Sequence, residues 1–121
     1  MSSKLPGRRD PQLLKGVLPM LILAVLSRKE SYGYELVVQL EQEGLTDIAT
    51  GTVYPVLTRL EREGLLTFRL IASASGPARK YYSPTKEGLA HLSEAISAWS
   101  TLDLVVRTIT TALPEDSRKG R

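Results

Sequence analysis

Cysteine is absent from the 121-residue chain, and His91 is its only histidine. Without thiols the chain can form neither disulfides nor thiolate metal sites, and His91 has no imidazole or thiol companion for a zinc or nucleophile site. The sequence also lacks a glycine-rich phosphate loop and a recognisable pair of an acid and a base. These absences predict a protein with no metal, no cofactor and no enzymatic activity, in which His91 is a surface residue.

Long hydrophobic runs are scarce as well. The longest, VLPMLILAVL at residues 17–26, has about half the length of a bilayer span and predicts a buried helix. Lys4, Arg8 and Arg9 precede it as in a secretory signal, but no small-residue cleavage site follows. The length of the chain fits one compact domain. We therefore expect a cytoplasmic protein that does not contact a membrane.

Apolar periodicity predicts three helices in the first half of the chain. The first covers about residues 12–27, the second covers about 32–43, and the third begins near 50–52. The second and third end in the similar stretches EQEGL and EREGL, whose glycines, Gly44 and Gly64, are typical stop signals.

The pattern changes after the third helix. Residues 65–71 and 78–83 are strand-like, and the turn-like stretch SASGP lies between them, so a β-hairpin is predicted. A last helix is expected to run to about residue 112, with Ser83 as its N-cap and Pro84 at its first helical position.

One stretch, GTVYPVLTRLEREG at residues 51–64, separates apolar from polar residues. Its apolar side chains share one helical face and should pack on the core. The rest of the helix presents hydroxyl and guanidinium groups and, in its first half, no carboxylate; we identify Thr52, Tyr54, Pro55, Thr58, Arg59 and Arg62 as candidate DNA-binding residues. Taken alone, the same pattern also fits an ordinary amphipathic surface helix.

The hairpin is basic, since no acidic residue occurs between Glu63 and Glu87. We expect Arg79 and Lys80 at its tip, followed by Tyr81, to neutralise DNA backbone charge. Three helices followed by a hairpin are the order of a winged helix-turn-helix, in which the third helix enters the major groove of double-stranded DNA. Tyr32 and Tyr34 either pack or contact DNA. A winged helix used only for protein-protein interaction is the alternative.

The last helix carries a heptad-like seam. A helix of roughly 29 residues is about 43 Å long, more than a domain of this size can cover from its own core. The seam therefore predicts a homodimer that reads an inverted-repeat operator, with the first helix as a further contact. The expected interface residues are Leu14, Leu18, Leu92, Ala95, Trp99, Leu102, Val106, Ile109 and Leu113.

The predicted organisation is a mostly α fold with a small antiparallel β-hairpin (α+β). It comprises a flexible arm at 1–11, a winged helix-turn-helix domain at 12–83, a dimerisation helix at 84–113 and a flexible tail at 114–121.

Trp99 is the only tryptophan and occupies the middle of the seam. It either packs in the interface or, with Leu92, Ala95 and Ile96, forms a site where a planar hydrophobic molecule stacks between two chains.

Three stretches in order, SYGYEL, GTVYPVLTRLEREGLL and RKYYSPTKEG, resemble the PadR-type transcriptional regulators, in the short branch with a single C-terminal helix. The resemblance covers about residues 13–113. It implies a homodimeric DNA-binding protein, usually a repressor, that responds to a small molecule or a stress signal. Some short PadR-like regulators bind planar drugs, which favours an effector site at Trp99.

Carried over by position, the resemblance places Thr52, Tyr54 and Arg59 among the recognition-helix contacts, and Lys80 and Tyr81 in the wing. Pro19 departs from the family pattern. A proline there is expected to kink the first helix or to delay its start.

Overall fold

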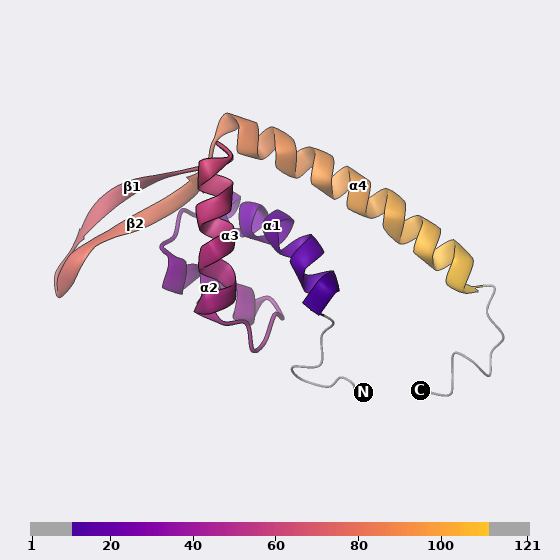
Figure 1. Ribbon diagram of the computed structural model, residues 1–121, viewed down its shortest axis with the longest axis horizontal. Helices are drawn as coiled ribbons and strands as arrows, with labels where there is room; N and C mark the ends of the chain where they lie inside the picture. The colour runs from indigo at the N-terminus through magenta and orange to yellow at the C-terminus, as the bar shows by residue number, and fades with distance from the viewer. Residues whose placement is uncertain (1–10, 112–121) are drawn as a thin grey trace.

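The computed structural model describes residues 11–111. Within this range, three helices, a two-stranded antiparallel hairpin and one long helix follow each other (Figure 1), which confirms the expected α+β winged helix-turn-helix. Most of the expected arm, the whole expected tail and Leu113 lie outside the described residues. The elements are α1 Pro11–Arg28, α2 Gly33–Gln42, α3 Thr50–Arg62, β1 Leu66–Ser73, β2 Gly76–Pro84 and α4 Lys86–Thr111.

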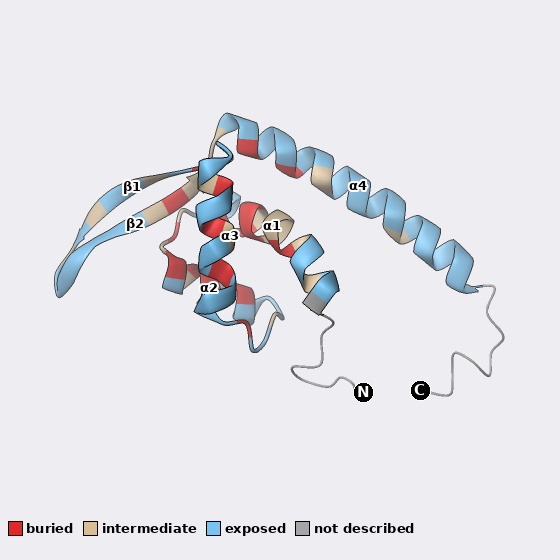
Figure 2. Cartoon of the chain, in the orientation of Figure 1, coloured by how far each residue is buried: buried red, intermediate tan, exposed pale blue. Residues whose placement is uncertain are grey.

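Helix α1 is the centre of the hydrophobic core. Ile22 and Leu23 are fully buried, and Leu18 and Leu26 are nearly so. Because its apolar residues occur all round the helix, α1 needs cover on several sides. It receives this cover from α2, α3, α4 and β2, and Figure 2 shows the buried residues gathered where these elements meet. The helix begins at Pro11 and continues through Pro19, so the delayed start expected from Pro19 is wrong.

Two glycines end α2 and α3 in the same way. Gly44 and Gly64 both have positive φ, 120° and 80°, a region that side chains disfavour. The N–H of Gly44 donates to the Glu41 carbonyl at 3.1 Å. The N–H of the next residue, Leu45, donates to the Leu40 carbonyl at 2.9 Å. The same pair of bonds recurs after α3. This arrangement satisfies the last carbonyls of each helix and confirms the stop signals expected from the sequence.

The hairpin differs from the expectation in the position of its turn. β1 and β2 pair with Ile71 opposite Arg79 and with Ser73 opposite Gly76, so the connection lies at residues 74–75. Arg79 and Lys80 are therefore inside β2 and not at the tip, where the sequence pattern predicts them. The physical reason is that the strands continue through the serine- and alanine-rich stretch, whose small side chains are compatible with extended backbone as well as with a turn.

The start of α4 is also corrected. Pro84 pairs with Leu66 as the last residue of β2, and Thr85 is the N-cap in place of Ser83. The N–H of Gly88 donates to Thr85 Oγ1 at 2.9 Å, and Oγ1 in turn donates to the Gly64 carbonyl at 2.7 Å. A threonine at this position satisfies a free helix N–H and ties α4 to the end of α3.

Only the beginning of α4 packs against the domain. Its buried residues are Gly88 and Leu92, and the helix then extends away from the other elements (Figure 1). From residue 93 to its end at Thr111, every residue of α4 is exposed except the half-buried Ala95 and Asp103. None of the helices within residues 11–111 combines the length and the hydropathy that a membrane span requires.

Gly88 offers a test of this junction. A Cβ at this position would lie 2.0 Å from the Leu65 carbonyl oxygen, a backbone atom that cannot turn aside. We expect Gly88→Ala to destabilise the fold by about 1–3 kcal/mol, seen as a lower thermal midpoint by circular dichroism. Gly51→Ala is the control, because a Cβ at Gly51 meets nothing within 4 Å and alanine favours a helix. An unchanged midpoint for Gly88→Ala would contradict the close approach.

Candidate nucleic-acid interface

Helix α3 is anchored by one face and exposed on the other. Val53, Leu57 and Leu60 are buried in the core at no more than 1% exposure. The six candidate DNA-binding residues that the sequence placed on this helix are all exposed, namely Thr52, Tyr54, Pro55, Thr58, Arg59 and Arg62. The apolar spacing thus determines which side chains remain available to a ligand.

The first turns of α3 carry unused backbone groups. The N-cap Ala49 forms no side-chain capping bond, and Thr52 is the first residue whose N–H returns to the Ala49 carbonyl, at 3.0 Å. Pro55 lies six residues into the helix rather than in its first turn, so the Gly51 carbonyl lacks its helical donor. Free N–H groups at a helix N-terminus favour an anion such as a phosphate.

We call one side of α3 the wing flank, defined by the residues around a small cavity of about 230 Å³: Tyr32, Gly33, Tyr54, Arg79, Lys80 and Tyr82. Gly33 lets the helices approach closely here. A Cβ at Gly33 would lie 2.3 Å from the Tyr54 ring and hydroxyl. Tyr54 is therefore partly committed to packing, although 44% of its surface is exposed.

The wing cations on this flank are held by neighbouring side chains. The guanidinium of Arg79 lies 4.3 Å from the centroid of the Tyr32 ring, and Tyr32 meets Tyr81 edge-on at 5.3 Å. Lys80 Nζ lies 4.2 Å from the Phe68 ring centroid and 3.9 Å from Glu61 Oε1 on α3. The positive charge of Lys80 is thus partly offset by a carboxylate, which the sequence did not reveal.

The base of the wing is fixed to the segment before α2. Ser31 and Tyr82 exchange backbone hydrogen bonds of 3.3 and 2.9 Å, and Gln39 donates to the Ser31 hydroxyl at 2.8 Å. The Arg69 guanidinium donates to both carboxylate oxygens of Glu30. These hydrogen bonds hold the pKa of Glu30 below its usual value. The pKa of Tyr82 is raised, mainly by burial and to a lesser extent by the negative charge of Glu61.

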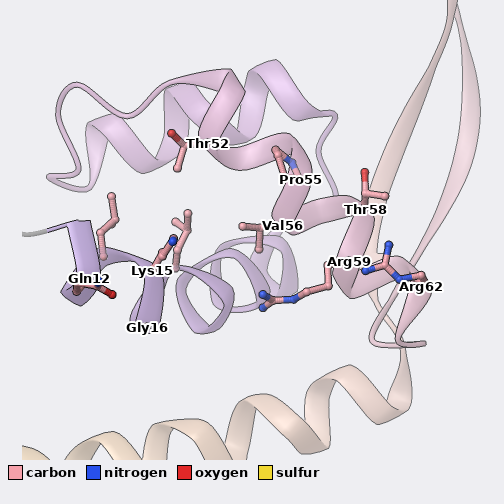
Figure 3. Close-up of a pocket in the computed structure, with 11 residues that line it drawn as sticks. Gln12, Lys15, Gly16, Thr52, Pro55, Val56, Thr58, Arg59 and Arg62 are labelled. Atoms are coloured by element: carbon pink, nitrogen blue, oxygen red, sulfur yellow. The ribbon is translucent and has the colours of Figure 1, made fainter.

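We call the opposite side of α3 the α1 flank. A groove of about 1110 Å³ lies there between α1 and α3. Figure 3 shows Gln12, Lys15 and Gly16 on the α1 wall, with Arg59 extending from α3 toward α1. The side chains of Leu14, Leu18, Thr52, Pro55, Val56, Thr58 and Arg62 complete the lining.

The α1 flank contains little negative charge. No carboxylate is among the groove residues that the structure describes. Within residues 11–111, neither Lys15 nor Arg62 has an acidic group within ion-pair distance, and Arg59 approaches Glu63 only at 3.8 Å. All three cations are exposed.

The residues expected at a dimer interface divide into two groups. Ile96, Trp99, Leu102, Val106 and Ile109 are between 45% and 65% exposed, and Ala95 is half-buried. Leu18 and Leu92 belong instead to the core, at 1% and 8% exposure. Their side chains are covered by their own chain, so the expectation that they face a partner or an effector is corrected. Leu14 is half-buried beside the α1 groove.

Sequence reasoning missed three contributors to the site. Gly33 provides the space for Tyr54, Glu30 binds the wing through Arg69, and Lys15 adds a cation from α1. Of these three residues, only Gly33 could have been noticed in the sequence, because it is a glycine between two tyrosines. Of those tyrosines, Tyr32 packs against the wing, whereas Tyr34 is 60% exposed and does not belong to the core.

Comparison with known proteins identifies the family. The sequence model of the transcriptional regulator PadR-like family matches residues 22–94. A PadR-like transcriptional regulator from Bacillus cereus is 40% identical, with a TM-score of 0.75 over 84% of this chain and 99% of that one. A PadR family regulator from Eggerthella lenta is 37% identical, with a TM-score of 0.77 over 84% and 88%.

A third relative is the transcriptional regulator YqjI of Escherichia coli. It is 33% identical over 90 residues, which are 73% of this chain and 42% of that protein. The matched elements in the family comparison extend from the second half of α1 to the beginning of α4. On its fold, its sequence and these likenesses, the chain belongs to the PadR-like family of transcriptional regulators, which act by binding DNA rather than by catalysis.

Proposed function

We propose that the protein is a homodimeric repressor that binds an inverted-repeat operator and is released by a planar hydrophobic effector. The main observation that supports a dimer is the exposed apolar face of α4. Over 26 residues the helix is about 39 Å long, and its own domain buries only Gly88 and Leu92. A second copy of the same helix can cover what remains.

The winged helix-turn-helix and α4 have separate roles in this proposal. In each copy, α3 enters the major groove with Thr52, Tyr54, Pro55, Thr58, Arg59 and Arg62, and the wing residues Arg79, Lys80 and Tyr81 follow the backbone. Pairing through α4 relates two recognition helices by a two-fold axis, so the operator is an inverted repeat with half-site centres about 34 Å apart. Where such an operator overlaps a promoter, the bound dimer blocks access to it.

The effector site is proposed at Trp99. Trp99 is 45% exposed, and Ile96 on the preceding turn is 48% exposed, so both residues are accessible to a ligand or a second chain. Across a two-fold axis, two Trp99 rings and their neighbours Ala95 and Ile96 offer flat apolar surfaces between which a planar molecule can stack. A ligand there would change the angle between the α4 helices and hence the spacing of the recognition helices.

The dimer is tested by substitution on the two faces of α4. Sedimentation equilibrium at micromolar concentration should give about twice the 13.3 kDa chain mass. Val106→Glu places a charge on the exposed apolar face of α4 and should shift the measured mass toward that of a single chain. Leu104→Glu is a matched control, because Leu104 is 64% exposed and lies on the opposite side of the helix. A monomeric wild-type chain would rule out the proposed dimer.

DNA recognition is tested at Arg59. We expect Arg59→Ala to weaken binding to the native operator by about 1–3 kcal/mol, roughly 5- to 150-fold, with a smaller loss on unrelated DNA. Arg28→Ala is the control, because Arg28 pairs with Glu43 at 3.2 Å and lines neither flank of α3. Fluorescence anisotropy with a labelled operator measures both. Equal affinities for wild type and Arg59→Ala would show that α3 docks differently.

The effector is tested by thermodynamic linkage. A planar aromatic compound that does not itself bind DNA should quench Trp99 fluorescence and weaken operator binding, and the operator should weaken compound binding by the same factor. Trp99→Ala should abolish compound binding in calorimetry while operator binding persists. Quenching with unchanged operator affinity would refute regulation from this site.

A further inference from the structure

The two flanks of α3 differ in how far their cations are neutralised. On the wing side, Arg69 is paired with Glu30, and Lys80 lies 3.9 Å from Glu61. Arg79 has no acidic partner within residues 11–111 and stacks instead on the Tyr32 ring. On the α1 flank, Arg59 lies 3.8 Å from Glu63, whereas Lys15 and Arg62 have no acidic partner within residues 11–111. The sequence pattern alone suggests the reverse, because the hairpin is the segment without acidic residues. Tertiary contacts bring the missing carboxylates to the wing from α3 and from the segment before α2.

We propose that the α1 flank is the main phosphate-binding surface of the protein, with Lys15 of α1 and Arg62 of α3 as the residues that contact the DNA backbone. This inference rests on the proposed DNA-binding function and specifies which surface supplies its electrostatic part. Exposed cations without an internal partner release the most counterions on binding DNA, because an internal carboxylate already offsets part of the charge of its neighbour.

The position of the groove supports DNA as the partner. Lys15 shares the groove with Thr52, Thr58 and Arg59, which belong to the exposed face of the recognition helix. A duplex seated on that face therefore lies within reach of the first turns of α1. The groove lining comes from both helices, with Lys15 on α1 and Arg59 on α3 labelled in Figure 3, and none of the lining residues that the structure describes is acidic. A phosphate strand fits this chemistry, whereas a basic protein partner does not.

The flank also determines which phosphates are contacted. Figure 1 shows the wing on one side of α3 and α4 extending on the other, and α1 packs against α4. If two chains pair through α4, the α1 flanks face each other across the two-fold axis. Lys15 and Arg62 then contact the backbone between the two half-sites, while the wings reach outward to the flanking DNA.

A matched pair of lysine substitutions tests the inference. Lys15→Gln and Lys80→Gln remove one positive charge each from opposite flanks, and the full chain is retained so that Lys4, Arg8 and Arg9 are the same in every comparison. The probe is a labelled duplex of random sequence, titrated by anisotropy between 50 and 200 mM salt. Equal thermal midpoints by circular dichroism show that each variant is folded.

We expect Lys15→Gln to make the plot of log affinity against log salt shallower by about 0.9 for each phosphate that the variant no longer neutralises. Between 50 and 200 mM salt, the loss of affinity should then be roughly 3- to 4-fold smaller than the loss for wild type, for each such phosphate. Because Glu61 already offsets part of its charge, Lys80→Gln should change the slope by less than Lys15→Gln does. Arg62→Ala should reproduce the effect of Lys15→Gln.

The other outcomes decide against the inference. An equal or larger slope change for Lys80→Gln would assign the backbone contacts to the wing, and an unchanged slope for Lys15→Gln would remove α1 from the interface. In both cases the wild type still binds the duplex and the proposed function stands. If the wild type binds neither random duplex nor operator at low salt, the proposed function itself fails.

Discussion

The backbone pairing of Ser31 with Tyr82 is the contact on which the arrangement of the site depends. It joins the segment before α2 to the second strand of the wing, two stretches far apart in the chain. Ser31 is fully buried and Tyr82 nearly so, so both N–H and C=O groups need partners, which each supplies to the other. Once this pairing is made, Glu30 meets Arg69, and Tyr32 packs against Tyr81 and Arg79. The wing then has one position relative to α3.

Fixing the wing also determines its electrostatics. A strand held against the end of α3 brings Lys80 to Glu61, so a lysine that looks free in the sequence is opposed by a carboxylate. Among the residues that the structure describes, Lys15 at the exposed end of α1 has no such neighbour. An ion pair at the surface contributes little to stability, but it reduces the positive charge that is available to an external phosphate. The distribution of carboxylates, more than that of cations, thus separates the two flanks.

Helix α4 imposes a different constraint. Three residues hold its first two turns to the domain. Thr85 caps a free helix N–H, Gly88 allows the close approach to the Leu65 backbone, and Leu92 is buried in the core. The remaining turns are beyond the reach of the core. Their exposed apolar side chains are too many for an isolated surface helix in water, and this is the physical reason for proposing a second chain.

The sequence by itself determined the order of the elements, the buried face of α3 and the ends of α2 and α3. These features depend on local spacing and on the conformational preferences of glycine, which act between residues close in the chain. Local patterns were ambiguous at the hairpin turn and at the start of α4. Small residues are compatible with either strand or turn, and Thr85 was recognisable as the N-cap only from the hydrogen bond that its Oγ1 accepts from the Gly88 N–H.

Tertiary structure alone decided which candidate residues are available. Leu18 and Leu92 have the spacing of an interface seam, yet both are buried in the core of their own chain. The spacing could not show this, because helical periodicity does not distinguish an intramolecular partner from an intermolecular one. The wing lysine and the α1 lysine have the same charge in the sequence, and both are exposed. They differ because folding places Glu61 beside Lys80 and no described carboxylate beside Lys15.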